Sequence, residues 1–164
     1  MPRFGKIIVS MTSDGVIGLD GALPWHYSAD LKRFKRLTLN STVIMGRKTW
    51  DSLPIRPLPK RQNIVLTKNS KPEIDHYSSL ELAVENAAHS EIWFIGGSEI
   101  FALSVHYTKL IDVTYVPDQI NGENCVFFPP IDWNGWEPGP KIRSREDERL
   151  VHQEFYFRTQ TLHS

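Results

Sequence analysis

The chain has 164 residues, of which 40% are hydrophobic and 23% are charged, and its 19 basic side chains balance its 19 acidic ones. This length supports one well-buried core and is short for two ordinary domains, so we expect a single domain over residues 1–164. The zero net charge gives no overall attraction to nucleic acid or to an anionic membrane, and we expect neither as a required partner.

Export, membrane and metal signals are weak in this sequence. The apolar run at residues 7–9 is too short for the core of a signal peptide, and no run approaches the ~18 apolar residues that span a bilayer. The single cysteine, Cys125, excludes an internal disulfide, and no Cys/His grouping has the spacing of metal ligands. The six histidines are scattered, so structural or surface roles are the default for each. We expect a cytoplasmic monomer without a metal site.

The predicted elements begin with a strand and a glycine-rich loop. Residues 4–11 are apolar and β-branched, which predicts a strand, and residues 12–15 predict a turn after it. The loop that follows contains several glycines and has an apolar tip at Pro24 and Trp25. This composition predicts a long mobile lid.

The first predicted helix, over residues 28–39, places a carboxylate beside this lid. Leu31, Phe34 and Thr38 recur at helical spacing, and Asp30 borders their stripe. The opposite face is assigned to Lys32, Arg33, Lys35 and Arg36. Asp30 has two interpretations: a first-turn acid that complements the helix dipole by about 0.3–1 kcal/mol, or a reactive carboxylate under a lid.

Strands and helices alternate as far as residue 116. Further strands are predicted at residues 42–45, 63–67, 91–95 and 110–116. Further helices are predicted from Arg47 to the proline-rich stretch 54–59, over 78–88 with Ser78 or Ser79 as N-cap, and from residue 98 onward. This alternation predicts an α/β fold with an open, mostly parallel sheet and ligands at the carboxyl ends of its strands. Residues 150–158 predict an antiparallel edge hairpin.

Two strand-to-helix junctions have the character of anion sites. The glycines at 96 and 97 permit a close backbone approach to a pyrophosphate, although a tight structural turn explains them equally well. The junction at residues 45–49 adds two cations and a hydroxyl at a helix start, against which stands a solvated basic turn. The GxGxxG and GxxxxGK[ST] patterns are missing, so a dinucleotide site would be of another kind.

The sequence resembles the dihydrofolate reductase family over essentially its whole length. The motifs that carry the resemblance are VIG at 16–18, LPW at 23–25, ADL..FKR.T at 29–38, MGRKTW at 45–50, RPLP.R.NIVLT at 56–67 and IGG...F at 95–101. The resemblance implies a central, mainly parallel eight-stranded sheet with an antiparallel C-terminal edge strand and four flanking helices. It also implies hydride transfer from NADPH that reduces 7,8-dihydrofolate to tetrahydrofolate.

The resemblance assigns the substrate site to the region around Asp30. In the family, an acid at this position binds the amino group and adjacent ring nitrogen of the pterin and favours protonation at N5. Thr114 matches the threonine that braces the acid, and Arg61 matches the arginine that clamps the glutamate tail; its alternative is a surface ion pair. Further substrate contacts are implied for Ile8, Leu31, Phe34, Leu53 and Ile95. Trp25 and Leu23 match lid residues that exclude water from the nicotinamide, and with Asp30 they form the implied catalytic set.

The implied cofactor site combines the lid with both strand-to-helix junctions. Its implied residues are Ser10, Ile17, Gly18, Leu23, Gly46, Arg47, Lys48, Thr49, Leu66, Thr67, Lys68, Ile95, Gly96, Gly97, Ser98, Glu99, Ile100 and Phe101. Basic residues near the 2′-phosphate would select NADPH over NADH. The family joins its two glycines by a cis peptide, so we expect one between Gly96 and Gly97.

Some positions depart from the family pattern. Ser10 stands where alanine is usual, Phe101 replaces a common tyrosine, and an extra residue lies near 54–55. Residues 123–126 replace a short Asp-Thr turn in the loop that latches the lid. These changes alter the polarity and rim of the pocket, and a variant insensitive to antifolates would be one result.

Two other functions remain open at this stage. A relative with the same fold could reduce another pteridine or a pyrimidine of flavin synthesis; Arg61 argues against it, because a substrate without the glutamate tail has no carboxylate to bind. A nucleotide-binding or regulatory module, such as one that binds RNA, is the other alternative. Asp30 and the zero net charge argue against that module.

Overall fold

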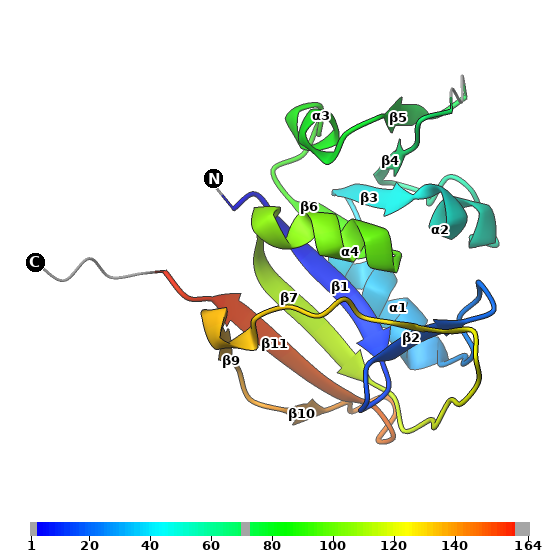
Figure 1. The fold of residues 1–164 in the computed structure, drawn as a ribbon, viewed down its shortest axis with the longest axis vertical. Helices are drawn as coiled ribbons and strands as arrows, with labels where there is room; N and C mark the ends of the chain where they lie inside the picture. The colour runs from blue at the N-terminus through cyan, green and yellow to red at the C-terminus, as the bar shows by residue number, and fades with distance from the viewer. Residues whose placement is uncertain (1–2, 70–72, 160–164) are drawn as a thin grey trace, which may run out of the picture.

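A mixed sheet organises the part of the chain described by this computed structural model, residues 3–69 and 73–159 (Figure 1). Its strands follow the order β10-β11-β7-β1-β6-β3-β4-β5, and β9 also pairs with β11. The strands are β1 (Gly5–Met11), β2 (Val16–Leu19), β3 (Thr42–Gly46), β4 (Gln62–Leu66), β5 (Asp75–Tyr77), β6 (Ile92–Gly96), β7 (Thr108–Tyr115), β8 (Cys125–Phe127), β9 (Trp136–Pro138), β10 (Ile142–Arg143) and β11 (Val151–Phe157). The helices are α1 (Ser28–Thr38), α2 (Arg47–Ser52), α3 (Leu80–Glu85) and α4 (Ser98–Ser104).

The strand directions agree with the predicted fold class. Strand β1 runs parallel to β6 and β7, β3 runs parallel to β4 and β6, and β4 runs parallel to β5. Strand β11 is antiparallel to β7, as predicted. The short strands β9 and β10 pair with its other side, so the sheet extends one step beyond β11.

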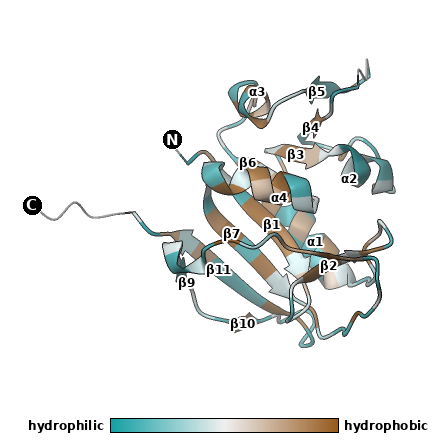
Figure 2. Cartoon of the chain, viewed as in Figure 1, coloured by the Kyte–Doolittle hydropathy of each residue, from teal (hydrophilic) through white to brown (hydrophobic). Residues whose placement is uncertain are grey.

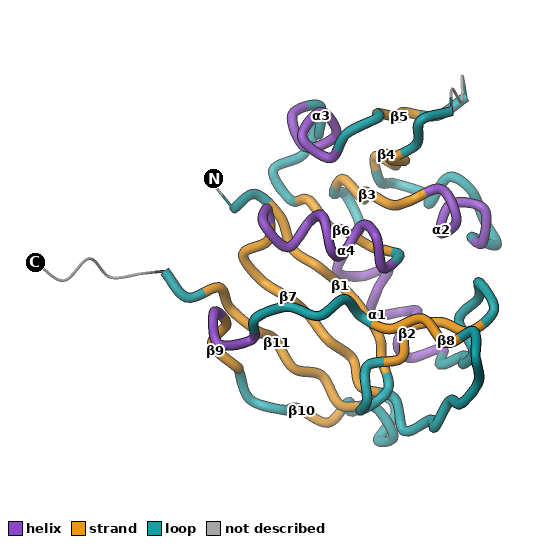
Figure 3. Tube along the Cα trace, viewed as in Figure 1, coloured by secondary structure: helices purple, strands orange, loops and turns teal. Residues whose placement is uncertain are grey.

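The prediction of the lid as one continuous loop is wrong, because residues 16–19 of it form strand β2. Residues of β2 pair antiparallel with β8 in a separate two-stranded sheet (Figure 3). From β8 the chain continues toward β9, and Phe128 and Ile131 of this connection pack against the core. Strand β2 is short and contains Gly18, and its pairing partner lies far along the sequence, so no local pattern marks it.

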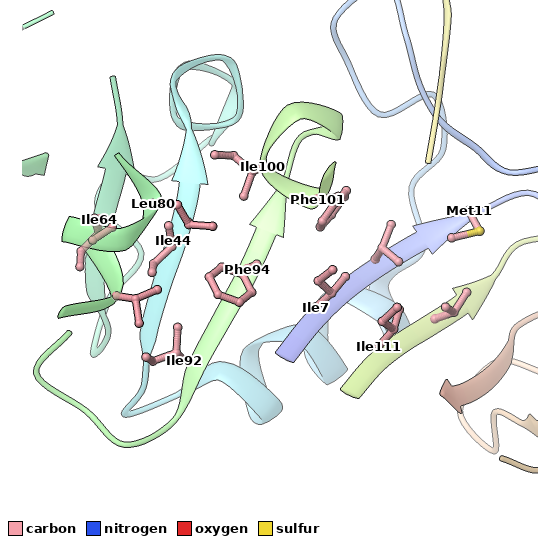
Figure 4. Packing of buried hydrophobic residues seen from close by; sticks show 14 of the residues in the cluster. Ile7, Met11, Ile44, Ile64, Leu80, Ile92, Phe94, Ile100, Phe101 and Ile111 are labelled. Carbon is pink, nitrogen blue, oxygen red and sulfur yellow. The ribbon is translucent and has the colours of Figure 1, made fainter. Parts of the chain in front are cut away.

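Side chains alternate between the two faces of the sheet, because successive residues of a strand point to opposite sides. On one face, Ile7, Ile44 and Phe94 pack against Ile100 and Phe101 of α4 (Figure 4). On the other, Ile8 and Met45 belong to a second cluster that includes Trp50 of α2 and Phe34 of α1. Helices α4 and α1 thus lie on opposite faces, and apolar residues are concentrated along the central strands (Figure 2).

The helices are confirmed with small changes of boundary. Helix α3 is shorter than predicted, and Ser79 is its N-cap, with Oγ accepting a hydrogen bond from the backbone N–H of Leu82 at 3.2 Å. Helix α1 begins at Ser28 as predicted. None of the helices in the described residues has both the length and the apolar character needed to cross a membrane.

Candidate active site

A cleft of about 840 Å³ opens at the carboxyl ends of the parallel strands. Its walls come from the ends of β1, β3, β4 and β6, from the β2 segment, from α1 and α2, and from the start of α4. Ligands of open α/β sheets bind at this edge because the strand-to-helix loops gather there. The volume falls in the usual range for small-molecule sites.

Most of the residues that the sequence proposed for the site line this one cleft. From the substrate set these are Ile8, Asp30, Leu31, Phe34, Leu53, Ile95 and Thr114. From the cofactor set they are Ser10, Ile17, Gly18, Leu23, Gly46, Arg47, Lys48, Thr49, Leu66, Thr67, Lys68, Gly96, Gly97, Ser98, Glu99, Ile100 and Phe101. The two proposed residues outside the lining are Trp25 and Arg61. Residues far apart in the sequence are therefore brought together.

Asp30 is a half-buried carboxylate in the first turn of α1, facing the cleft. Burial raises the pKa of its carboxyl above the ordinary value, because a charged carboxylate loses hydration inside the protein. The neighbouring hydroxyl of Thr114 and the positive charge of Arg33 oppose this rise in pKa. Asp30 is thus both a first-turn acid and a group whose ionisation the pocket controls.

Arg33 does not lie on the solvent face to which the sequence assigned it. Its guanidinium donates two hydrogen bonds to the carboxylate of Asp112 on β7, both at 2.7 Å. The side chain of Asp112 is 4% exposed, so this charge needs a partner inside the protein. The sequence did contain a signal, because Asp112 is an acid in the middle of an apolar strand. The helical periodicity of residues 28–39 does not show which side chain forms its ion pair.

Trp25 is buried and lies outside the lining of the cleft. Its side chain is buried in a small cluster with Val116 and Leu150, and its indole N–H donates to Oγ of Ser10 at 3.3 Å. Ser10 lines the cleft, so the lid is connected to the pocket through a hydroxyl that alanine would lack. Leu23, two residues earlier, lines the cleft and is 49% exposed.

Arg61 lies beside the substrate end of the cleft with a free charge. Its guanidinium donates to Oγ1 of Thr38 at 3.0 Å and to the carbonyl of Pro59 at 2.9 Å, and lies 5.9 Å from the ring centre of Phe34. Among residues 3–69 and 73–159, no carboxylate forms an ion pair with it. These contacts orient the cation while leaving its charge available, which disfavours the alternative of a surface ion pair.

The opposite end of the cleft is a glycine cradle. The peptide between Gly96 and Gly97 is cis, as predicted. A Cβ on Gly96 would lie 3.3 Å from the Phe101 ring, and one on Gly46 would lie 3.2 Å from Ile100. The φ of Gly96 is +119°, a backbone conformation that residues with a side chain rarely adopt. This backbone therefore comes close to any ligand at the junction.

Basic side chains surround this cradle. Arg47, Lys48 and Lys68 line the cleft. Arg47 also pairs with Asp51 at 3.2 Å, and the same carboxylate approaches Arg56 at 3.6 Å. The two acids of this region, Asp51 and Glu99, are outnumbered by the arginines and lysines, so its net charge is positive. This charge favours phosphate over the alternative of a merely solvated basic turn.

Two contacts hold the lid, one at Asp20 within it and one at Tyr27 at its C-terminal end. Asn124, just before β8, donates through Nδ2 to Oδ1 of Asp20 at 2.7 Å, so residues 123–126 do engage the lid. At the C-terminal end, the hydroxyl of Tyr27 donates to Asp118, and the guanidinium of Arg149 lies 4.9 Å from the Tyr27 ring centre. Burial, followed by the contact with Asp118, raises the pKa of Tyr27 to about 12. The hydroxyl therefore stays protonated and keeps this contact at physiological pH.

The cleft also contains residues that the sequence did not suggest. They are Val9, Gly21, Ala22, Ser52, Ser78, Leu103 and Val126. Gly21 and Ala22 adjoin the predicted lid residue Leu23, so adjacency would have found them. Val126 comes from β8, whose pairing with the lid only the fold reveals. No group of three or more metal-binding side chains occurs among the described residues.

Comparison with known proteins agrees with this geometry. The dihydrofolate reductase family model matches residues 6–162. A dihydrofolate reductase of Mycobacterium leprae is 38% identical over 136 residues, covering 79% of this chain and 82% of that protein. One of Neisseria gonorrhoeae is 35% identical over 153 residues, covering 91% of this chain and 93% of that protein. The structure of the Enterococcus faecalis enzyme, complexed with NADP(H) and RAB-propyl, has a TM-score of 0.82 at 28% identity, covering 97% of this chain and all of that one. With a cleft built from the same motifs that prompted the resemblance, the chain belongs to the dihydrofolate reductase family.

Proposed function

We propose that this chain reduces 7,8-dihydrofolate to 5,6,7,8-tetrahydrofolate with a hydride from NADPH. The observation that carries the proposal is the half-buried Asp30 carboxylate, in one cleft with a glycine cradle at one end. Near the other end lies Arg61, for which the described residues supply no ion-pair partner. Membership of the family supports the reaction. The assignment of roles to single residues rests on their positions in the cleft.

Asp30 binds and polarises the pterin. Its two carboxylate oxygens accept hydrogen bonds from the exocyclic amino group and the neighbouring ring nitrogen. Its negative charge in an apolar pocket favours a proton on N5 of the pterin, which makes C6 electrophilic. Thr114 orients the carboxylate through its hydroxyl. Phe34, Leu31 and Leu53 flank the flat ring, and Ile8 and Ile95 present backbone carbonyls to its edge.

The residues at the other end fit a dinucleotide phosphate. Gly46, Gly96 and Gly97 leave the space that side chains would fill, and Arg47, Lys48 and Lys68 supply positive charge. NADPH, when bound, supplies the hydride. Thr49 and Ser98 offer hydroxyls to phosphate, while Ile17, Gly18 and Leu23 cover the nicotinamide end and exclude water. The other cofactor contacts are assigned to Ser10, Leu66, Thr67, Glu99, Ile100 and Phe101.

Arg61 determines which pterins are good substrates. A planar guanidinium held by Thr38 and Pro59 suits the α-carboxylate of the glutamate tail, which it can bind through two parallel hydrogen bonds. A tail-less pteridine or a pyrimidine of flavin synthesis would leave this cation unused. We further propose a monomer with one domain, because one chain supplies all parts of the cleft. We also propose a cytoplasmic location, as expected from the sequence.

The test is turnover by the purified chain. With dihydrofolate present, we expect loss of nicotinamide absorbance from NADPH and a much slower loss from NADH. A tail-less dihydropterin should give a higher KM than dihydrofolate. Absence of NADPH oxidation above background would refute the proposed reaction, and equal KM values would refute the role of Arg61.

A further inference from the structure

The sheet face under α1 changes character between its two halves. On β1, β3, β4 and β6 this face is an apolar cluster that includes Ile8, Met45 and Val65. On β7 and β11 the register pairs Thr114 with His152 and Asp112 with Glu154, so polar side chains lie opposite one another across the two strands. Asp30 and Arg33 approach these strands from α1. A connected polar group therefore lies directly behind the substrate end of the cleft.

Within this group, the ion pair of Arg33 and Asp112 is geometrically fixed. Both guanidinium hydrogen bonds measure 2.7 Å, and Asp112 and Thr114 are each 2% exposed. A bidentate pair of this kind has little freedom to rearrange. The part of the group that can change its hydrogen bonding is the chain from His152 through Thr114 to Asp30.

His152 contacts the threonine that braces the catalytic carboxylate. Nδ1 of His152 lies 2.8 Å from Oγ1 of Thr114. The hydroxyl of Thr114 has a single proton, and Thr114 lines the same cleft as Asp30, where its hydroxyl favours the ionised form of this carboxyl and lowers its pKa. If the proton is directed to the carboxylate, the hydroxyl oxygen must accept from Nδ1. If Nδ1 instead has no proton, it draws the hydroxyl proton away from Asp30.

We propose that His152 is a positioning residue: its Nδ1–H donates to Thr114, and this directs the hydroxyl proton of Thr114 to the carboxylate of Asp30. The inference deepens the proposed reduction and rests on it for the catalytic role of Asp30. The ionised form of Asp30 gains a donor whose direction is fixed by a residue outside the cleft.

The charges around His152 keep this arrangement in place over a wide pH range. Arg33 and Arg36 face the ring from α1, Asp112 faces it from β7, and its register partner on β10 is the apolar Ile142. Burial, followed by Arg33, lowers the pKa of His152, so the ring is neutral at neutral pH. In acid, the second proton goes to Nε2, and Nδ1 remains a donor. Only the other neutral tautomer would interrupt the chain of hydrogen bonds.

Three substitutions separate hydrogen bonding from packing. H152L removes the donor, H152N places an amide N–H near the position of Nδ1, and H152Q places the amide one bond farther out, near Nε2. The carboxyl carbon of Asp30 is titrated by NMR in the ligand-free protein, and imidazole nitrogen shifts of the unmodified chain report the tautomer. We expect an Nδ1–H tautomer and an Asp30 pKa that rises by about half to one pH unit in H152L, the scale of one hydrogen bond. H152N should restore most of that shift, and H152Q should not.

Either of two results would overturn the proposal: an Nε2–H tautomer at neutral pH, or equal Asp30 pKa values in H152L and the unmodified chain. The tautomer measurement needs no variant, so it decides the matter even if H152L fails to fold. In turnover, the pH midpoint of hydride transfer should move with the Asp30 pKa in H152L and return in H152N. If the unmodified chain lacks turnover, the proposed reaction fails, while the titration still judges His152.

Discussion

The two ends of the cleft differ in the kind of groups that form them. At the α1 end, a few polar side chains are buried and paired with one another, as in the contacts among Arg33, Asp112, Thr114 and His152. At the α4 end, glycine backbone forms the surface, and the cations Lys48 and Lys68 are exposed to solvent. The first end fixes the ionisation of one carboxylate, and the second makes room for a charged ligand.

This difference indicates where substitutions should be costly. Charges in a buried, paired group depend on each other, so removing one leaves its partner unsatisfied. Exposed cations act almost independently, are screened by salt, and contribute modestly one at a time. We therefore expect large, coupled effects at the α1 end and small, additive effects at the α4 end.

The largest effect is expected at the buried ion pair. Arg33→Met leaves the carboxylate of Asp112 buried without a partner and should lower the free energy of unfolding by about 3–5 kcal/mol. Adding Asp112→Leu to it should recover most of the loss, because both charges are then removed together. Chemical denaturation of the two single variants and the double variant measures this coupling. Additive losses in the double variant would contradict the comparison.

Asp30→Asn should have the largest effect on chemistry. We expect hydride transfer at neutral pH to fall by ~10²-fold or more, the scale for loss of acid–base assistance. The rate should partly recover in acid, where N5 of the pterin protonates without help. Single-turnover kinetics across pH checks both expectations, with the surface variant Asp132→Asn as control. Unchanged turnover would refute the role of Asp30.

The same substitution should also affect stability in a pH-dependent way. Because burial raises the pKa of Asp30 in the folded state, the folded chain binds this proton more tightly than the unfolded chain. Stability is then lost as the pH rises from the ordinary pKa of an aspartate through the raised one. Asp30→Asn lacks this loss, so it should be more stable than the unmodified chain at neutral pH, with the difference shrinking in acid. Denaturation at several pH values measures it.

Sequence patterns predicted the strands whose residues are mostly apolar. Strands β1, β3, β4 and β6 contain runs buried on both faces, and such runs are visible without tertiary information. Strands β5, β9 and β10 have two or three residues and are partly exposed, so their sequences contain no repeating pattern to detect. Their pairing follows from the strands already in place.

The candidate site was predicted unevenly for a related reason. The family resemblance located most of the lining of the cleft, because the residues within each of its motifs are contiguous in the sequence. Thr114 was implied by the resemblance, but the other contacts behind Asp30 were missed: Arg33 and Asp112 are 79 positions apart, and Thr114 and His152 are 38 apart. The one available signal was a charged or polar residue at a buried position of an apolar strand, which requires a partner that only the fold identifies.

Arg61→Leu should have an effect on substrate binding that is smaller than the effects expected at the buried α1 end and larger than those expected at the exposed cations of the α4 end. Loss of a bidentate contact to the glutamate tail should raise KM for dihydrofolate by about tenfold or more, with kcat little changed. For a tail-less dihydropterin the change should be small. Steady-state kinetics with both substrates tests this, and Arg143→Leu, on an exposed strand, serves as the matched control. Equal effects on both substrates would remove the clamp from the site.

The smallest effect is expected at the exposed cations of the α4 end. Lys68→Met should weaken NADPH binding by only about twofold to fivefold, because an exposed charge contributes little and is screened. The affinity for NADH, which lacks the 2′-phosphate, should stay the same, and the difference between the two cofactors should shrink further in high salt. Titrations of both cofactors at low and high salt measure it. A loss of NADPH affinity as large as the effect of breaking a buried pair, or a loss that salt does not change, would show that the groups at this end are also coupled. The contrast between the two ends of the cleft would then be wrong.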